Sequence, residues 1–128
     1  MMILYASNMA LDFDITPYVE GWKKRMAEAE AQMAARKKEA FADAQRLARV
    51  LREKYGCTRV IGIGSTFNEK DFTKHSDIDL VGFGLPPEKY FSISAAISRL
   101  TSFKVDLIPA EDARPLTRRL VEEEGVEL

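Results

Sequence analysis

Cysteine is scarce in this sequence, with Cys57 the only one among 128 residues. An intramolecular disulfide is therefore impossible, which is typical of proteins in a reducing compartment. The sequence also lacks an apolar run of the roughly 20 residues that a helix needs to cross a bilayer. Its first residues have neither the basic region nor the long apolar stretch of a signal peptide. We therefore expect a cytoplasmic protein with no membrane contact.

An excess of charge of either sign is missing as well. There are 19 basic and 20 acidic residues, for a formal net charge of −1. Broad, nonspecific binding to DNA needs a strongly basic surface, so we expect no direct DNA binding. Hydrophobic residues make up 46% and charged residues 30% of the chain, which is typical of a folded globular protein.

Residues 16–55 are predicted to form one long amphipathic helix. Thr16 can cap its first turn, and Pro17 fits the first helical position without the loss of a needed donor. Apolar residues then recur at spacings of three or four residues or their sum: Trp22, Met26, Ala29, Met33, Ala40, Ala44, Leu47, Leu51 and Tyr55. An unbroken helix of about 39 residues would be roughly 58 Å long, more than the width of a small domain. Part of it should project, bend or bind a partner, and a homodimer through this helix is one such arrangement.

The remainder of the chain predicts an α/β fold, with a short mixed sheet flanked by helices. Gly56 is expected to end the long helix in the left-handed conformation. Three segments rich in β-branched and apolar residues are typical of strands: 58–63, 77–83 and 103–108. Two segments with helical periodicity and proline near their starts lie between and after them: 86–100 and 110–124. Residues 1–15 carry no clear signal.

Two carboxylates are predicted on one face of the second strand. Side chains alternate between faces, so Asp77 and Asp79 point the same way while Ile78 and Leu80 point into the core. The two acids lie within about 7 Å of each other. Like charges at 4 Å repel by roughly 4 kcal/mol at an effective dielectric constant of about 20. Such a pair therefore needs a counter-charge.

A divalent cation is the best candidate for that counter-charge. Lys74 and His75 are the nearest basic residues in sequence, but neither is an obvious bidentate partner. Magnesium prefers one or two carboxylates together with waters and substrate phosphates. Asp106 adds a third carboxylate, in the strand expected beside the second. Two metal ions about 3.5–4 Å apart can activate an attacking hydroxyl and neutralise a leaving phosphate. Each aspartate alone could cap a turn or lie on the surface, but the three together favour a metal site.

The turn after the first strand is a candidate phosphate-binding element. Gly64 allows a close approach of the backbone to a phosphate, and Ser65 offers a hydroxyl and an N–H. A glycine–serine turn is common in loops and means little by itself. Its weight comes from the Asp-x-Asp strand that follows after eleven intervening residues.

With these motifs, the sequence resembles the minimal nucleotidyltransferases of the DNA polymerase β superfamily. That family shares a Gly-Ser motif, a spacer of about this length and a strand with the pattern Ser-Asp-x-Asp-Leu, found here as Ser76-Asp77-Ile78-Asp79-Leu80. The resemblance covers roughly residues 41–128 and includes the acidic strand of Asp106. It implies a nucleotidyltransferase-like fold. We assign residues 37–128 to the nucleotidyltransferase domain and residues 1–36 to an N-terminal segment with a helical extension.

The resemblance also implies an activity, its cofactors and a partner. Asp77 and Asp79 would bind two Mg²⁺ ions, Asp106 would bind the catalytic ion and help deprotonate the acceptor hydroxyl, and Gly64 and Ser65 would hold the triphosphate. ATP or another nucleoside triphosphate would be the donor, with pyrophosphate released. Many members accompany an all-helical HEPN-type toxin and silence it by adding AMP to a tyrosine.

The sequence departs from the family directly after the Gly-Ser motif. The usual run there is Arg-Ala-Arg-Gly, whereas this chain has Thr66-Phe67-Asn68-Glu69-Lys70. The missing arginines would steady phosphate charge, and Lys70 or Lys74 could replace them. Two alternative functions stay open: a degenerate antitoxin that binds a nucleotide or a partner without turnover, and a transferase that modifies a small hydroxylated drug.

Overall fold

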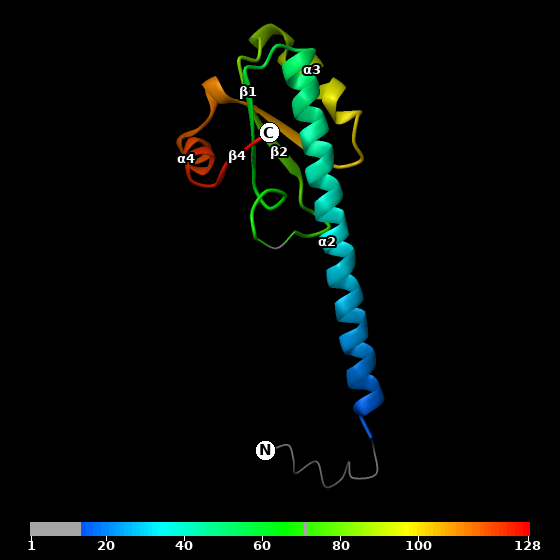
Figure 1. Cartoon of the computed structure of the whole chain (residues 1–128). Coiled ribbons are helices and arrows are strands. Elements are labelled where there is room, and N and C mark those ends of the chain that lie inside the picture. Colours follow the sequence, from blue (N-terminus) through cyan, green and yellow to red (C-terminus); the bar gives the residue numbers. More distant parts are fainter. Residues whose placement is uncertain (1–13, 71) are drawn as a thin grey trace. The chain divides into compact units, whose positions relative to one another are not determined.

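The structure is a computed structural model that describes residues 14–70 and 72–128 (Figure 1). The chain divides into two compact units, with the boundary between Gln32 and Met33. Residues 1–13, which belong to the predicted N-terminal segment, lie outside the described part. Among the described residues, no helix combines the length and the apolar character that crossing a membrane requires.

Helix α2 (Thr16–Glu53) confirms the predicted long helix. Its first turn differs in one detail from the prediction that Thr16 is the cap. The backbone N–H of Thr16 donates to Oδ1 of Asp14 at 2.9 Å, so Asp14 serves as the capping side chain. Hydrogen bonding by the Thr16 side chain, and to a lesser degree by its backbone N–H, lowers the pKa of the Asp14 carboxyl. In the first unit, large apolar side chains of α2 are exposed, with Trp22 at 57% and Met26 at 45%.

The second unit is built on a four-stranded mixed sheet with the order β3-β2-β1-β4. Its strands are β1 (Arg59–Ile63), β2 (Ile78–Phe83), β3 (Val105–Pro109) and β4 (Val126–Glu127). β1 runs antiparallel to both β2 and β4, and β2 runs parallel to β3. The three longer strands confirm the predicted ones to within two residues at either end.

One face of the sheet is covered by the second half of α2 and by α3 (Tyr90–Ser98). The buried stripe of α2 recurs with helical spacing: Ala40, Ala44, Leu47, Ala48 and Leu51. It packs on Val60 of β1, on Ile78 and Leu80 of β2, and on Leu107 of β3, all of them at most 1% exposed. The prediction that Ile78 and Leu80 point into the core is therefore confirmed.

The opposite face is covered in part by α4 (Pro115–Glu124), whose Leu120 and Val121 pack on Ile61, Ile63 and Val81. Figure 1 shows α4 on one side of β1 and the carboxyl-terminal half of α2 on the other. The alternation of side chains along β2 places Asp79 on the face of Val81, away from the larger core. The sheet thus separates its main core from its acidic side chains.

Two predicted helices are interrupted, and one strand was missed. The segment 110–124 consists of the short helix η2 (Ala110–Asp112) and of α4, because Arg114 precedes a proline and is extended at φ −69° and ψ 158°. The segment 86–100 likewise begins with the short helix η1 (Pro87–Lys89) before α3. Strand β4 has only two residues, too few for an alternating pattern in the sequence.

Candidate active site

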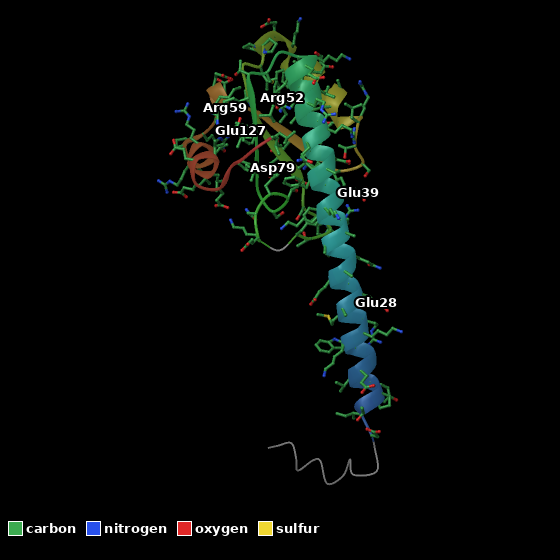
Figure 2. The ribbon with its side chains drawn as sticks, in the orientation of Figure 1. Glu28, Glu39, Arg52, Arg59, Asp79 and Glu127 are labelled. Atoms are coloured by element: carbon green, nitrogen blue, oxygen red, sulfur yellow. The ribbon has the colours of Figure 1, made fainter. Side chains whose placement is uncertain are left out.

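Asp79 and Asp106 lie side by side in one row across the sheet. The parallel register of β2 and β3 pairs these two residues directly, and the antiparallel register of β1 and β2 pairs Ile63 with Asp79. Paired residues of neighbouring strands point to the same face, about 5 Å apart. The structure therefore brings together the two acids that the sequence had placed on separate strands. Figure 2 labels Asp79 on β2.

Asp77 precedes β2 by one residue and contacts a basic residue that sequence reasoning missed. Nζ of Lys104 lies 3.8 Å from Oδ2 of Asp77, and the Lys104 side chain is 79% exposed. The sequence had suggested Lys74 and His75 as the nearest basic groups. Lys104 is distant in sequence from Asp77 but precedes Asp106 by two residues. Because β2 and β3 are parallel neighbours, their entries lie together, and only this pairing identifies Lys104.

The carboxyl of Asp79 carries the strongest electrostatic perturbation at the site. Burial, together with the negative charges of Asp106 and Asp77, raises its pKa from 3.8 to about 6, and Lys104 offsets this only in part. Asp79 is therefore close enough to both Asp106 and Asp77 for their negative charges to repel its own. The protein alone leaves this negative charge under-compensated.

The Gly64–Ser65 turn is tied to the acids by two hydrogen bonds. Ser65 Oγ donates to Ser76 Oγ at 2.9 Å, and Thr66 Oγ1 donates to the backbone carbonyl of Asp77 at 3.1 Å. Thr66 is 1% exposed, so this second bond is shielded from water. The Gly-Ser motif at the end of β1 and the Asp-x-Asp motif at the start of β2, separated by eleven residues in sequence, are thus in contact in the fold.

Gly64 itself has two reasons to be glycine. Its φ of +90° lies in the region that L side chains avoid, and a Cβ at this position would lie 3.1 Å from Oδ2 of Asp79. The backbone of the turn therefore approaches the central carboxylate as closely as it can. A phosphate held at this turn would lie next to the acidic row.

The donor set fits an open metal site better than a closed one. In the described part of the chain, no three His, Cys, Asp or Glu side chains stand close enough together to hold an ion by themselves. The carboxylates are nevertheless coupled, and their oxygens are hard ligands of the kind that Mg²⁺ prefers. Mg²⁺ usually keeps several waters and shares its ligands with substrate phosphates. A few carboxylates beside a candidate phosphate-binding turn fit that requirement.

Coupled carboxylates, a close glycine–serine turn and a mixed sheet define a class of protein that handles phosphate groups. Within that class, the chain belongs to the nucleotidyltransferase domain family, whose model matches residues 44–128. This match confirms the resemblance seen in the sequence, and the protein is a nucleotidyltransferase. None of the curated proteins matches the chain.

Several solved structures share the fold of this chain. A chain from a mutant of the toxin–antitoxin pair MntA–HepT is similar with a TM-score of 0.56 and 15% identity, over 66% of this chain and 70% of that one. The unsubstituted pair gives 0.52 and 16%, over 67% and 68%. A structure assigned to the minimal nucleotidyltransferases gives 0.50 and 22%, over 77% of this chain and 94% of that one. At these identities the likeness shows the fold.

Proposed function

We propose that this chain transfers a nucleoside monophosphate, with ATP as the expected donor, to a hydroxyl group in a Mg²⁺-dependent reaction. The observation that carries the proposal is the pairing of Asp79 with Asp106, next to a glycine that Asp79 approaches so closely that no Cβ would fit comfortably. One phosphate group of the donor could thus contact both the carboxylates and the Gly64–Ser65 turn.

The three aspartates have distinct parts in the proposed reaction. Asp77 and Asp79 would hold two Mg²⁺ ions, and Asp106 would add a third carboxylate and face the acceptor. Bound Mg²⁺ supplies charge stabilisation for the attacking and leaving oxygens. The acceptor hydroxyl gives up its proton, for which Asp106 is the nearby base, and its oxygen forms a bond to the α-phosphorus. The bond from that phosphorus to the bridging oxygen breaks, and pyrophosphate leaves with the electron pair.

The acidic face also offers a surface for the organic part of a substrate. A groove of about 300 Å³ has Val81 and Phe83 of β2 among its lining residues, together with Arg118 of α4. Val81 follows Asp79 by two residues on the same face, so the groove begins about 7 Å from the acids. A planar ring of the donor or acceptor can pack on its apolar side chains while its reacting group reaches the acids.

The acceptor is proposed to be a tyrosine of an all-helical HEPN-type toxin. The support is the resemblance in sequence, together with a fold shared with a chain of the toxin–antitoxin pair MntA–HepT. The exposed apolar side chains in the first half of α2, Trp22 among them, offer a surface for this partner or for a second copy of the chain. A toxin as acceptor supplies its own hydroxyl, so the small domain needs no acceptor-binding domain of its own.

Transfer of label from α-labelled ATP, with Mg²⁺ and a co-expressed HEPN partner, tests the proposal. We expect the partner to gain the mass of AMP on a tyrosine, with one pyrophosphate released for each transfer. Asp79→Asn and Asp106→Asn should each reduce transfer to background. Asp112→Asn serves as the matched control, because it removes an exposed carboxylate in η2, away from the row.

Each alternative function has its own outcome in this assay. Binding of ATP without label transfer, unchanged by Asp106→Asn, would favour a degenerate antitoxin. Label on a small hydroxylated compound instead of the partner would favour a drug-modifying enzyme. Full transfer by both Asp79→Asn and Asp106→Asn would show that these acids do not have the proposed catalytic role.

A further inference from the structure

A hollow with basic walls has Asp77, the residue before β2, among its lining residues. Its volume is about 440 Å³, and four of its lining residues have basic side chains: Arg36, Lys74, His75 and Lys104. Ser76 lines it as well. We refer to it below as the basic hollow. Arg36, Lys74 and Lys104 against Asp77 leave a formal charge of +2 with His75 neutral, in a chain whose net charge is −1.

These basic side chains come from three separate segments of the second unit. Arg36 belongs to α2, and its guanidinium lies 4.8 Å from the centre of the Phe103 ring, which holds it at the rim. Lys104 follows that phenylalanine at the entry to β3. Lys74 lies in the turn before β2, which is ordered by a 2.9 Å hydrogen bond from the backbone of Thr73 to Ser76 Oγ. Three segments have to converge to form the basic hollow.

One hydrogen bond links the wall of the basic hollow to the Gly64–Ser65 turn. Ser76 lines the basic hollow and also accepts the 2.9 Å hydrogen bond from Ser65. A chain of phosphates that starts at the acidic row and passes this turn therefore reaches the basic walls. Lys70, the other lysine considered from the sequence, lies elsewhere, with Nζ 3.5 Å from Glu124.

We infer that the basic hollow binds the terminal phosphates of the donor and then the pyrophosphate that leaves. This inference rests on the proposed function, because it extends the same site. Arg36, Lys74 and Lys104 would replace the charge that arginines after the Gly-Ser motif would supply. Lys104 has a second role: its ammonium group lies 3.8 Å from Asp77, and a cation held by Asp77 would leave Lys104 available for a phosphate.

Binding of inorganic pyrophosphate, measured by calorimetry in EDTA, tests the inference without metal, nucleotide or turnover. We expect Lys104→Gln to weaken binding by about three- to ten-fold. The triple variant Arg36→Gln, Lys74→Gln, Lys104→Gln should lose most of the binding and most of its dependence on salt. Lys89→Gln is the matched control, because it removes an exposed lysine of η1 that does not line the basic hollow.

Asp77→Asn separates the inference from a merely structural effect. The amide removes the negative charge and frees Lys104, so metal-free pyrophosphate should bind more tightly than to the unsubstituted protein. Damage to the fold would weaken binding instead, and thermal unfolding of each variant reports on that directly.

Three results would overturn the inference. They are unchanged binding in the triple variant, an equal loss in the lysine control, and weaker binding by a well-folded Asp77→Asn variant. The label-transfer assay is separate. If the protein transfers AMP but substitutions in the basic hollow leave pyrophosphate binding unchanged, this inference alone is refuted. If pyrophosphate binds at the basic hollow but no AMP is transferred, the proposed function alone is refuted.

Discussion

Asp79→Asn is expected to stabilise the metal-free protein at neutral pH, although it removes a central residue of the site. The folded state raises the pKa of this carboxyl from 3.8 to about 6. A carboxyl with a raised pKa stabilises the fold only while it is protonated. That contribution is complete below about pH 3.8 and is lost as the pH rises through about 6. Asparagine has no charge to bury and avoids this loss.

The size of the effect follows from the pKa. A rise from 3.8 to about 6 corresponds to roughly 3 kcal/mol, at about 1.36 kcal/mol for each pH unit. Asp79 is only partly buried and solvent screens its charge, so we expect about half of this, roughly 1.5 kcal/mol. For a chain of this size, that should raise the melting temperature by about 6 °C.

Thermal unfolding in EDTA at pH 7.5 and pH 4 measures the effect, with Asp112→Asn as control. The gain from Asp79→Asn should appear at pH 7.5 and largely vanish at pH 4, where aspartate is protonated in the fold. The control should change little at either pH. An equal gain at both pH values, or a loss at pH 7.5, would refute the reasoning, because neither depends on ionisation of Asp79 in the expected sense.

Three further substitutions probe the frame that holds the site. Gly64→Ala should destabilise the fold by about 1–2 kcal/mol in urea unfolding, because φ is +90° and the added Cβ crowds Asp79. The control Gly21→Ala, at a partly exposed position of α2 with room for a Cβ, should be neutral or stabilising, and equal effects would contradict this reasoning. Leu47→Ala should cost about 2–5 kcal/mol, since this side chain is 0% exposed under the sheet, and a cost below 1 kcal/mol would argue against this packing. Tyr90→Phe should cost about 1 kcal/mol, because the hydroxyl donates to a backbone carbonyl of β3 at 2.6 Å, and unchanged stability would show that this bond contributes nothing net.

Much of the fold was readable because its elements have regular periods. The buried stripe of α2 repeats at helical spacing, and β2 alternates with period two, so the sequence predicted which residues of each segment face the core. Prediction failed where periodicity ends. Arg114 interrupts the last helix through its proline neighbour, and β4 is held by pairing with β1 instead of by a pattern of its own.

For the site, the sequence determined the chemical groups and the face of each strand that carries them. It therefore specified Asp77, Asp79 and Asp106 and the Gly64–Ser65 turn, because side-chain direction in a strand depends on position alone. Tertiary structure decided the register that puts Asp79 beside Asp106, and the approach of Lys104 to Asp77. Such contacts join segments far apart in the chain. They depend on how the strands and helices pack, which no local pattern of residues records.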